Sequence, residues 1–455
     1  MSRLRRGGGV AALTAGAVLA TAPPASAHGL GSRGDLPLPI WMFAYGAAAA
    51  LLISFAGLAV FWRTARLEGG IEGRVLLEPG EATRAIAAAG RALGLGLFVL
   101  VFVAAAFGDP DTADNLAPVF VYVVCWVGLT LVSALVGDVW RILNPFDTLA
   151  ALGQRLRPNR RQPSDYRLGH WPALAGLVAF VWLELIYPYR AEPRTLAVAI
   201  AVYTAVVLAG TARWGRAWLR QGEAFTVFFG LLSHIGPLYA DDAGRIRARP
   251  PLAGLVGLKP DAGAQAIVIV ALGSTSFDGL SRTRFWADLT RDYELWQNVV
   301  LSTVGLVWAM SVVTLAFVGA MRITARLHRR RHPELTSAFA HSLVPIAFAY
   351  ALAHYFSLLV FEGQSAVALA SDPLGRGWNL FGTAGQAVNF TAVSTSTIAY
   401  VQAAGIVVGH VAGVVMAHDR ALVLFRQKAA TRSQYPLLGA MVLFTVGGLA
   451  LLLGA

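Results

Sequence analysis

The stretch "AHSLVPIAFAYALAHYFSLLVFEGQ", residues 340–364, decides the fold class. From Leu343 to Phe361 it is almost wholly apolar, and a helix needs about 20 such residues to cross the hydrocarbon core of a bilayer. Similar runs recur along the whole chain, in which 56% of the residues are hydrophobic and only 14% are charged. Soluble domains have about 25% charged residues. The sequence therefore predicts an all-α, polytopic membrane protein.

Ten membrane spans are expected, with both ends of the mature chain outside. They occupy residues 39–62, 84–107, 118–138, 170–189, 195–211, 264–280, 296–321, 337–361, 397–417 and 435–453. A further apolar segment, 222–238, is short and contains Gly, Ser and Pro. We expect it to be re-entrant or interfacial, because the arginines at 245, 247 and 249 look cytoplasmic. All spans belong to one membrane domain, residues 28–455.

The net charge of +12 does not indicate a nucleic-acid partner. The arginines lie in short loops between the predicted spans, which is the distribution that orients a membrane protein. The expected partners are instead the lipid bilayer and a small-molecule or ion substrate. The single cysteine, Cys125, excludes an intrachain disulfide and a cysteine-based zinc or iron–sulfur site.

Residues 1–27 have the pattern of a cleaved signal peptide. A basic start is followed by an apolar run over 7–20, too short to span a bilayer, and by small residues at 25 and 27. Cleavage would leave His28 as the N-terminus, outside the plasma membrane, where its amine and imidazole would form a chelate that suits copper. The alternatives are an uncleaved first helix, or a histidine that follows the cleavage site by chance.

Ionisable residues inside membrane spans are candidates for function by default, because their burial is costly. The eighth and ninth predicted spans hold the densest set: His341, His354, Gln402, His410 and His418. From the helical rise of ~1.5 Å per residue, His354 lies near the outer surface and level with Gln402, whereas His410 lies in the inner half. We take His354 and His410 as candidate metal ligands. A hydrogen bond between helices is the alternative for both.

Two acidic residues are candidate catalytic groups near the outer face. Glu184 lies about one turn inside the outer end of the fourth span. In "GSTSFDGLS" the apolar run stops at Gly273 and three hydroxyl residues precede Asp278, which suggests a break in the backbone at membrane depth. Glu184 either pairs with Arg190 or forms a proton or cation site. Asp278 either binds a cation and orients water or caps the segment that follows it. We expect Asp278, Glu184 and His354 to converge at an outer vestibule.

Several segments together resemble a family of bacterial, largely actinobacterial, polytopic membrane proteins that are often named fenitrothion hydrolase. The resemblance lies in "HGLGSRGDLPLPIW" (28–41), "LVGDVWRILNPFDTL" (135–149), "WLELIYP" (182–188), "LGSTSFDGLS" (272–281), residues 340–364 and "GHVAGVVMAHDRAL" (409–422). It implies an organophosphate triester hydrolase in which a divalent metal ion, zinc or copper, activates water. Because the chain shows no soluble domain, such a site would lie between helices near the outer surface.

Two other functions remain open from the sequence. A permease for a metal ion or small solute fits the short, interrupted central segments and the polar groups at different depths. A haem or redox subunit fits the histidines alone, although two axial histidines need the same depth in the bilayer. The sequence contains no nucleotide-binding loop that would power transport.

Overall fold

The computed structural model describes residues 37–67, 72–156 and 165–453, so the predicted signal peptide and His28 lie outside the described chain. The structure confirms an all-α membrane bundle, in which nine helices of the described residues are long and apolar enough to cross a bilayer. Seven of them are single helices: α2 (Ile40–Phe61), α3 (Glu81–Phe107), α9 (Pro193–Trp214), α12 (Ala262–Ser281), α14 (Leu295–His328), α16 (Leu343–Ser371) and α17 (Thr395–Leu424). The other two are composite: Leu116–Leu135 consists of α4 (Leu116–Val119), η2 (Phe120–Gly128) and α5 (Leu129–Leu135), and Gln427–Leu453 consists of α18 (Gln427–Ser433) and α19 (Tyr435–Leu453).

The remaining helices are shorter, and one of them corresponds to the tenth expected span. That helix is α8 (Trp171–Leu185), with 15 residues. The others are α6 (Trp140–Leu143), α7 (Pro145–Leu156), α10 (Arg216–Gln221), α11 (Ala224–Ser233), the 3₁₀ helix η3 (Ala253–Leu255), α13 (Arg284–Thr290) and α15 (His332–Ala340). α16 begins six residues later than the expected span at 337 and continues to Ser371, because the first part of that segment forms α15.

The segment that contains α11 enters and leaves the bundle on one side. α11 has ten residues, about 15 Å of helix, which is too short to cross a bilayer. Glu223 before it contacts Asn144, and Leu238 after it pairs with Gly137. Both contacts lie in the chain that follows α5, which agrees with the re-entrant segment expected over 222–238.

A small antiparallel sheet lies beside the re-entrant segment. Its strands are β1 (Arg74–Leu77), β2 (Leu238–Ala240) and β3 (Ile246–Ala248), in the order β1-β3-β2. Asp241, in the turn between β2 and β3, accepts hydrogen bonds from Arg245 and Arg247 at 2.7 Å. The sheet therefore ties the chain after α2 to the chain after α11.

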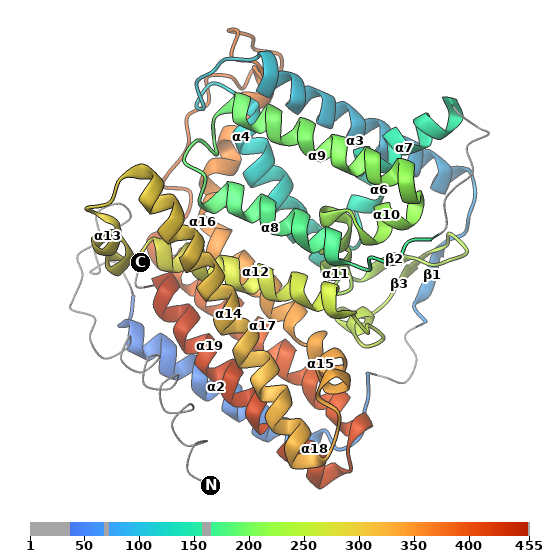
Figure 1. The fold of residues 1–455 in the computed structure, drawn as a ribbon, viewed down its shortest axis with the longest axis vertical. Helices are drawn as coiled ribbons and strands as arrows, with labels where there is room; N and C mark the ends of the chain where they lie inside the picture. Colours follow the sequence, from blue (N-terminus) through green and yellow to red (C-terminus); the bar gives the residue numbers. More distant parts are fainter. Residues whose placement is uncertain (1–36, 68–71, 157–164, 454–455) are drawn as a thin grey trace.

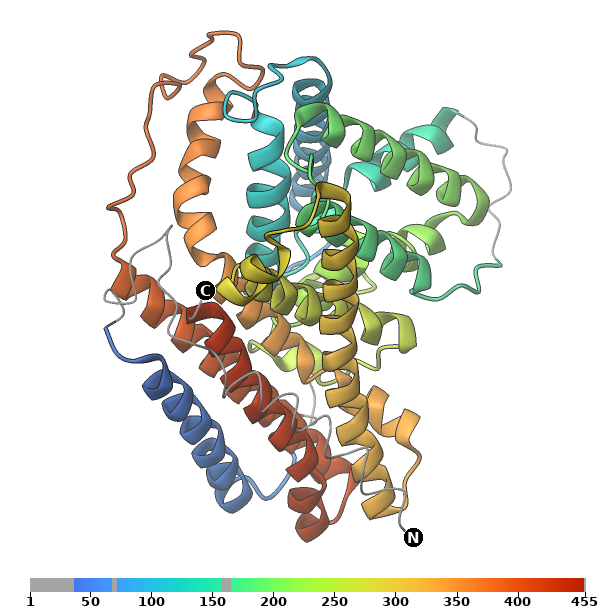
Figure 2. The same ribbon diagram turned by 60° about the vertical axis from the view of Figure 1, so that its left-hand side comes forward.

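The helices form two groups with α12 and α16 between them, as Figures 1 and 2 show. One group contains α3, α4–η2–α5, α8 and α9. The other contains α14, α17 and α19 together with α2, the first described helix, which lies beside the last ones. Asp419 of α17 holds this arrangement, because its buried carboxylate accepts hydrogen bonds from the Trp62 indole and from the backbone of Arg66 and Leu67.

The contact between α16 and α17 is made by small residues. A Cβ added to Gly409 would lie 2.1 Å from the Cβ of Ala349, and one added to Gly413 would lie 2.8 Å from the carbonyl oxygen of Ser342. Small residues let membrane helices approach closely. This close contact fixes the relative heights of His354 on α16 and His410 on α17.

Candidate functional site

A buried ionic cluster lies near the C-terminal end of α12. Asp278 is only 5% exposed, and its Oδ2 lies 2.6 Å from Nε2 of His354 on α16. Arg282, one turn after Asp278, donates from Nε to Oδ1 at 3.1 Å and from Nη2 to Oδ2 at 3.2 Å. Each carboxylate oxygen thus faces a basic group, which offsets the cost of burying the charge.

α12 runs without interruption through the segment in which the sequence suggested a break. It continues to Ser281, and the cap of the next helix is Thr283, whose hydroxyl accepts from the backbone of Trp286. The alternative in which Asp278 caps the following segment is therefore wrong. The hydroxyls of Ser274 and Ser276 donate to the carbonyl oxygens of Ala271 and Leu272 in α12 itself, which can accept a second hydrogen bond beside that of the helix backbone.

Glu184 of α8 reaches the same region through Tyr355. The Tyr355 hydroxyl donates to Glu184 Oε1 at 3.3 Å, and Tyr355 directly follows His354. Within the described chain Glu184 makes no ion pair with Arg190, the alternative that its position in the sequence suggested. The structure thus brings Asp278 and His354 into contact and places Glu184 one side chain away.

His354 keeps one ring nitrogen free of hydrogen bonds. Its Nδ1 is buried without a partner, while the ring packs edge-on against Tyr355 with centroids 4.9 Å apart. Buried polar atoms in native proteins are nearly always bonded to protein or water. The free Nδ1 is therefore available to a proton, a water molecule or a ligand.

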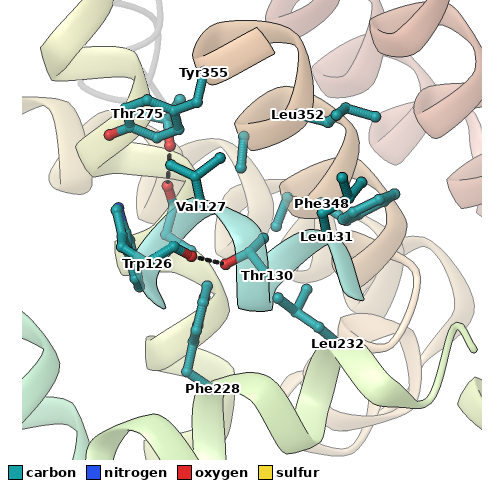
Figure 3. A pocket seen from close by; sticks show the side chains of 13 residues that line it. Trp126, Val127, Thr130, Leu131, Phe228, Leu232, Thr275, Phe348, Leu352 and Tyr355 are labelled. Atoms are coloured by element: carbon teal, nitrogen blue, oxygen red, sulfur yellow. Dashed lines mark hydrogen bonds between the residues drawn. The ribbon is translucent and has the colours of Figure 1, made fainter. Parts of the chain in front are cut away.

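A small cavity adjoins this cluster on the side of Tyr355. Figure 3 shows Tyr355 and Thr275 at one end of it and Phe228 and Leu232 at the other, with Trp126 on the wall. Water centres can occupy ≈ 20 Å³ of it, which is room for one water molecule, since each needs roughly 10–15 Å³. The lining is largely apolar, with hydroxyl groups at intervals. The cavity separates the ionic cluster from the re-entrant α11.

One wall of the cavity is a π-helix, η2 (Phe120–Gly128), inside the third long span. π-Helical segments are rare and often accompany functional sites. Here the wider turn presents Trp126 to α11, where its ring stacks on Phe228 with centroids 4.9 Å apart. No sequence pattern indicates this feature, because a π-turn has the same apolar composition as an α-helical span.

His410 lies away from the ionic cluster. Its Nδ1 donates to the carbonyl oxygen of Ile406 at 2.8 Å, and its Nε2 is buried without a partner. The ring packs against Phe444 of α19, with centroids 6.2 Å apart. His418, in contrast, has both ring nitrogens bonded, one to the Trp62 carbonyl and one to Gln434, and so holds α2 in place.

The donor groups of the described chain do not fit a zinc or copper ion. No group of three or more His, Cys, Asp or Glu side chains among the described residues is arranged to hold a metal. Asp278 and His354 supply two donors, and the Arg282 guanidinium already bonds both oxygens of Asp278. Zinc sites in proteins use three or four protein ligands. The metal-ligand roles suggested for His354 and His410 thus lack a ligand set here.

Glu223 is the buried acid that the sequence analysis missed. It is fully buried before α11, where its carboxylate accepts from the backbone of Phe225 and Thr226. The hydroxyls of Tyr203 and Thr226, the Trp140 indole and the Asn144 amide also donate to it. An acid just before an apolar run is the signal that indicates such a helix cap.

No family model, curated protein or solved structure matches this chain. The resemblance to the proteins named fenitrothion hydrolase therefore stays a prediction, and the functional argument rests on the geometry of the site.

Proposed function

We propose that the protein is a multi-pass permease of the plasma membrane that takes up and releases protons at Asp278 and His354, and so moves protons together with a small solute or ion. The observation that carries the proposal is the 2.6 Å contact between Asp278 and His354, buried within two membrane-spanning helices. Ionisable groups at such depth are costly, and in membrane proteins they mark ion pathways and proton relays. The sheet side of the bundle is assigned to the cytoplasm, following its arginines.

The cluster has two possible charge states, one with His354 protonated and one with His354 neutral. Protonated His354 forms an ion pair with Asp278, whereas neutral His354 donates one hydrogen bond and leaves Arg282 as the only full positive charge on the carboxylate. The Arg282 side chain is 58% exposed. When His354 is protonated, the Arg282 guanidinium can therefore leave Asp278 and turn to the outer solvent. Protonation thus selects between two arrangements at the outer end of α12.

The neighbouring groups supply a place for a solute to pass. Tyr355 connects the cluster to Glu184 on one side and lines the cavity on the other. The re-entrant α11 closes the opposite end of that cavity. A re-entrant segment inside the bilayer is tolerated where it is buried in protein or lines a cavity. The position of α11 opposite the ionic cluster supports a role for α11 as a gate on the cytoplasmic side.

The test measures proton entry into liposomes that contain purified protein and an internal pH dye, driven by a potassium diffusion potential. We expect flux well above that of protein-free liposomes, and its loss in Asp278→Asn. Asp241→Asn, outside the spans, is the matched control and should keep wild-type flux. Flux equal to that of protein-free liposomes, or unchanged in Asp278→Asn, would overturn the proposal.

A second candidate is the hydrolase that the resemblance implies, and one observation favours it. Asp278 orients the His354 ring while its Nδ1 stays free, which is the arrangement of a general base held by a carboxylate. In this role His354 would activate water for attack on a phosphotriester. Purified protein should then hydrolyse fenitrothion, and His354→Asn should lose turnover by ~10²-fold or more. If wild-type protein conducts protons but shows no turnover of fenitrothion, the hydrolase is ruled out and the permease remains.

A further inference from the structure

A stripe of exposed residues runs along α14 and changes from apolar to basic. Val304, Trp308 and Leu315 are each more than half exposed. Arg322 and Arg326 are exposed too, and the helical repeat of about 3.6 residues places them on the same face, roughly two turns beyond Leu315. Because α14 is long and apolar enough to span the bilayer, the apolar part of this face contacts lipid. The stripe therefore presents apolar side chains to lipid and positive charge at the C-terminal end of α14.

α18 brings further positive charge to the same end of α14, as Figure 1 shows. The two helices are joined there by a buried hydrogen bond of 2.9 Å from the Thr324 hydroxyl to the Ser433 carbonyl oxygen. Lys428 and Arg432 of α18 are exposed and lie one turn apart on one face of the helix. Two pairs of cations thus gather where α14 and α18 meet.

These four cations have no carboxylate beside them in the sequence and none in an ion pair. Residues 322–333 and 425–436 contain no Asp or Glu. Within the described chain, no ion pair involves Arg322, Arg326, Lys428 or Arg432. The arginines of the small sheet differ, since two of them share the carboxylate of Asp241. The orientation of a membrane protein accounts for an excess of cytoplasmic arginines, but it does not require uncompensated arginines in line with a lipid-facing stripe.

We infer that α14 and α18 bind an anionic phospholipid of the cytoplasmic leaflet, with its phosphate on Arg322 and Arg326 and its acyl chains along the apolar part of the stripe. The stripe calls for an occupant that is anionic at one end and apolar along the rest, and a soluble phosphate or a nucleic acid lacks the apolar part. Guanidinium groups bond phosphate oxygens well, and basic sites at the cytoplasmic ends of membrane helices bind anionic headgroups. Lys428 and Arg432 add attraction for the negative headgroup. The inference is independent of the proposed permease, because it uses neither Asp278 nor His354.

Native mass spectrometry of the delipidated full-length protein in detergent tests the site. The probes are phosphatidylglycerol and phosphatidylcholine with identical oleoyl chains, which differ in net charge but both contain a phosphate. Wild-type protein should bind phosphatidylglycerol about tenfold or more tightly, and Arg322→Gln/Arg326→Gln should lose this preference. Arg216→Gln/Arg220→Gln is the matched control. It removes the same charge at the same spacing from exposed positions of α10, and it should keep the wild-type preference.

Three outcomes would overturn the inference. The first is equal binding of the two lipids by wild-type protein, and the second is an equal loss of preference in both double variants. The third is displacement of phosphatidylglycerol by excess glycerol 3-phosphate, which would assign the arginines to a soluble phosphate.

A second measurement on wild-type protein applies if the Arg322→Gln/Arg326→Gln protein fails to fold. Phosphatidylglycerol with a photoactivatable group close to its headgroup is incorporated into vesicles that contain the protein. Labelled peptides should come mainly from residues 312–332 and 426–434. Even labelling of all the predicted cytoplasmic helix ends would overturn the inference.

Discussion

Glu223 and Asp278 are both buried acids inside the bundle, yet they are held in opposite ways. Among the described residues, Glu223 accepts hydrogen bonds from neutral groups: the backbone and Thr226 of α11, Tyr203 of α9, Trp140 of α6 and Asn144 after α6. Asp278 is held by one histidine and one arginine. Neutral donors keep their protons over the whole physiological range, whereas histidine gains and loses one. Glu223 is thus suited to fix α11, and Asp278 is suited to respond to protons.

The largest effect on stability is expected from Glu223→Ala. The change leaves the Tyr203 hydroxyl and the Trp140 indole without their acceptor, while the Asn144 amide keeps only Thr226. The expected cost is about 3–5 kcal/mol in the free energy of unfolding. Thermal unfolding of the purified protein, followed by tryptophan fluorescence, measures the loss. Glu334→Ala, an exposed acid of α15, is the matched control and should unfold like wild type. Equal unfolding temperatures for the two variants would contradict the structural role of Glu223.

Asp278→Asn should lower proton flux strongly and thermal stability only slightly. Asparagine keeps the shape of the side chain but removes the charge that pairs with His354 and Arg282, so proton flux should fall ~10²-fold. The unfolding temperature should fall less than in Glu223→Ala, because Arg282 can turn to solvent. Both quantities are measured on the same preparation. If Asp278→Asn unfolds as early as Glu223→Ala, the two acids do not differ in the way proposed.

A smaller effect is expected at the close contact that positions the ionic cluster. Gly409→Ala places a methyl group against Ala349 and should cost about 1–3 kcal/mol, the usual penalty for overpacking. Gly439→Ala on α19 is the matched control, since a Cβ there meets nothing within 4 Å. Urea unfolding in detergent compares the two. A Gly409→Ala protein as stable as the control would show that α16 and α17 can separate without cost.

The smallest effect concerns Asp241, an acid outside the spans. Partial burial acts to raise its pKa, but hydrogen bonds from Arg245 and Arg247 prevail and lower the pKa to about 2. Because the folded pKa lies below the unfolded value of about 3.9, the stabilisation is complete above pH 4 and is lost as pH falls towards 2. Unfolding temperatures measured from pH 5 to pH 2 should therefore fall slightly more steeply in wild type than in Asp241→Asn. Parallel curves would contradict this.

The interior of the site was only partly predictable. Asp278, Glu184 and His354 stood out because each is an ionisable residue in an apolar run, a property of the local sequence. Glu223 lies at the boundary of such a run, where an acid looks like part of a loop. The expected break in α12 was wrong because serines and threonines fit inside a helix when their hydroxyls bond to its own carbonyls.

The sequence by itself determined the class of fold, the approximate spans and the re-entrant segment. Whether a segment spans the bilayer depends on the hydrophobicity of some twenty consecutive residues, which is a local property of the sequence. The tertiary structure alone decided which helices meet. Asp278 and His354 are 76 residues apart, and α2 packs beside α17, whose Asp419 is 357 residues from Trp62. Such contacts depend on the shapes of whole helix faces and on small residues that permit close approach. No local pattern contains that information.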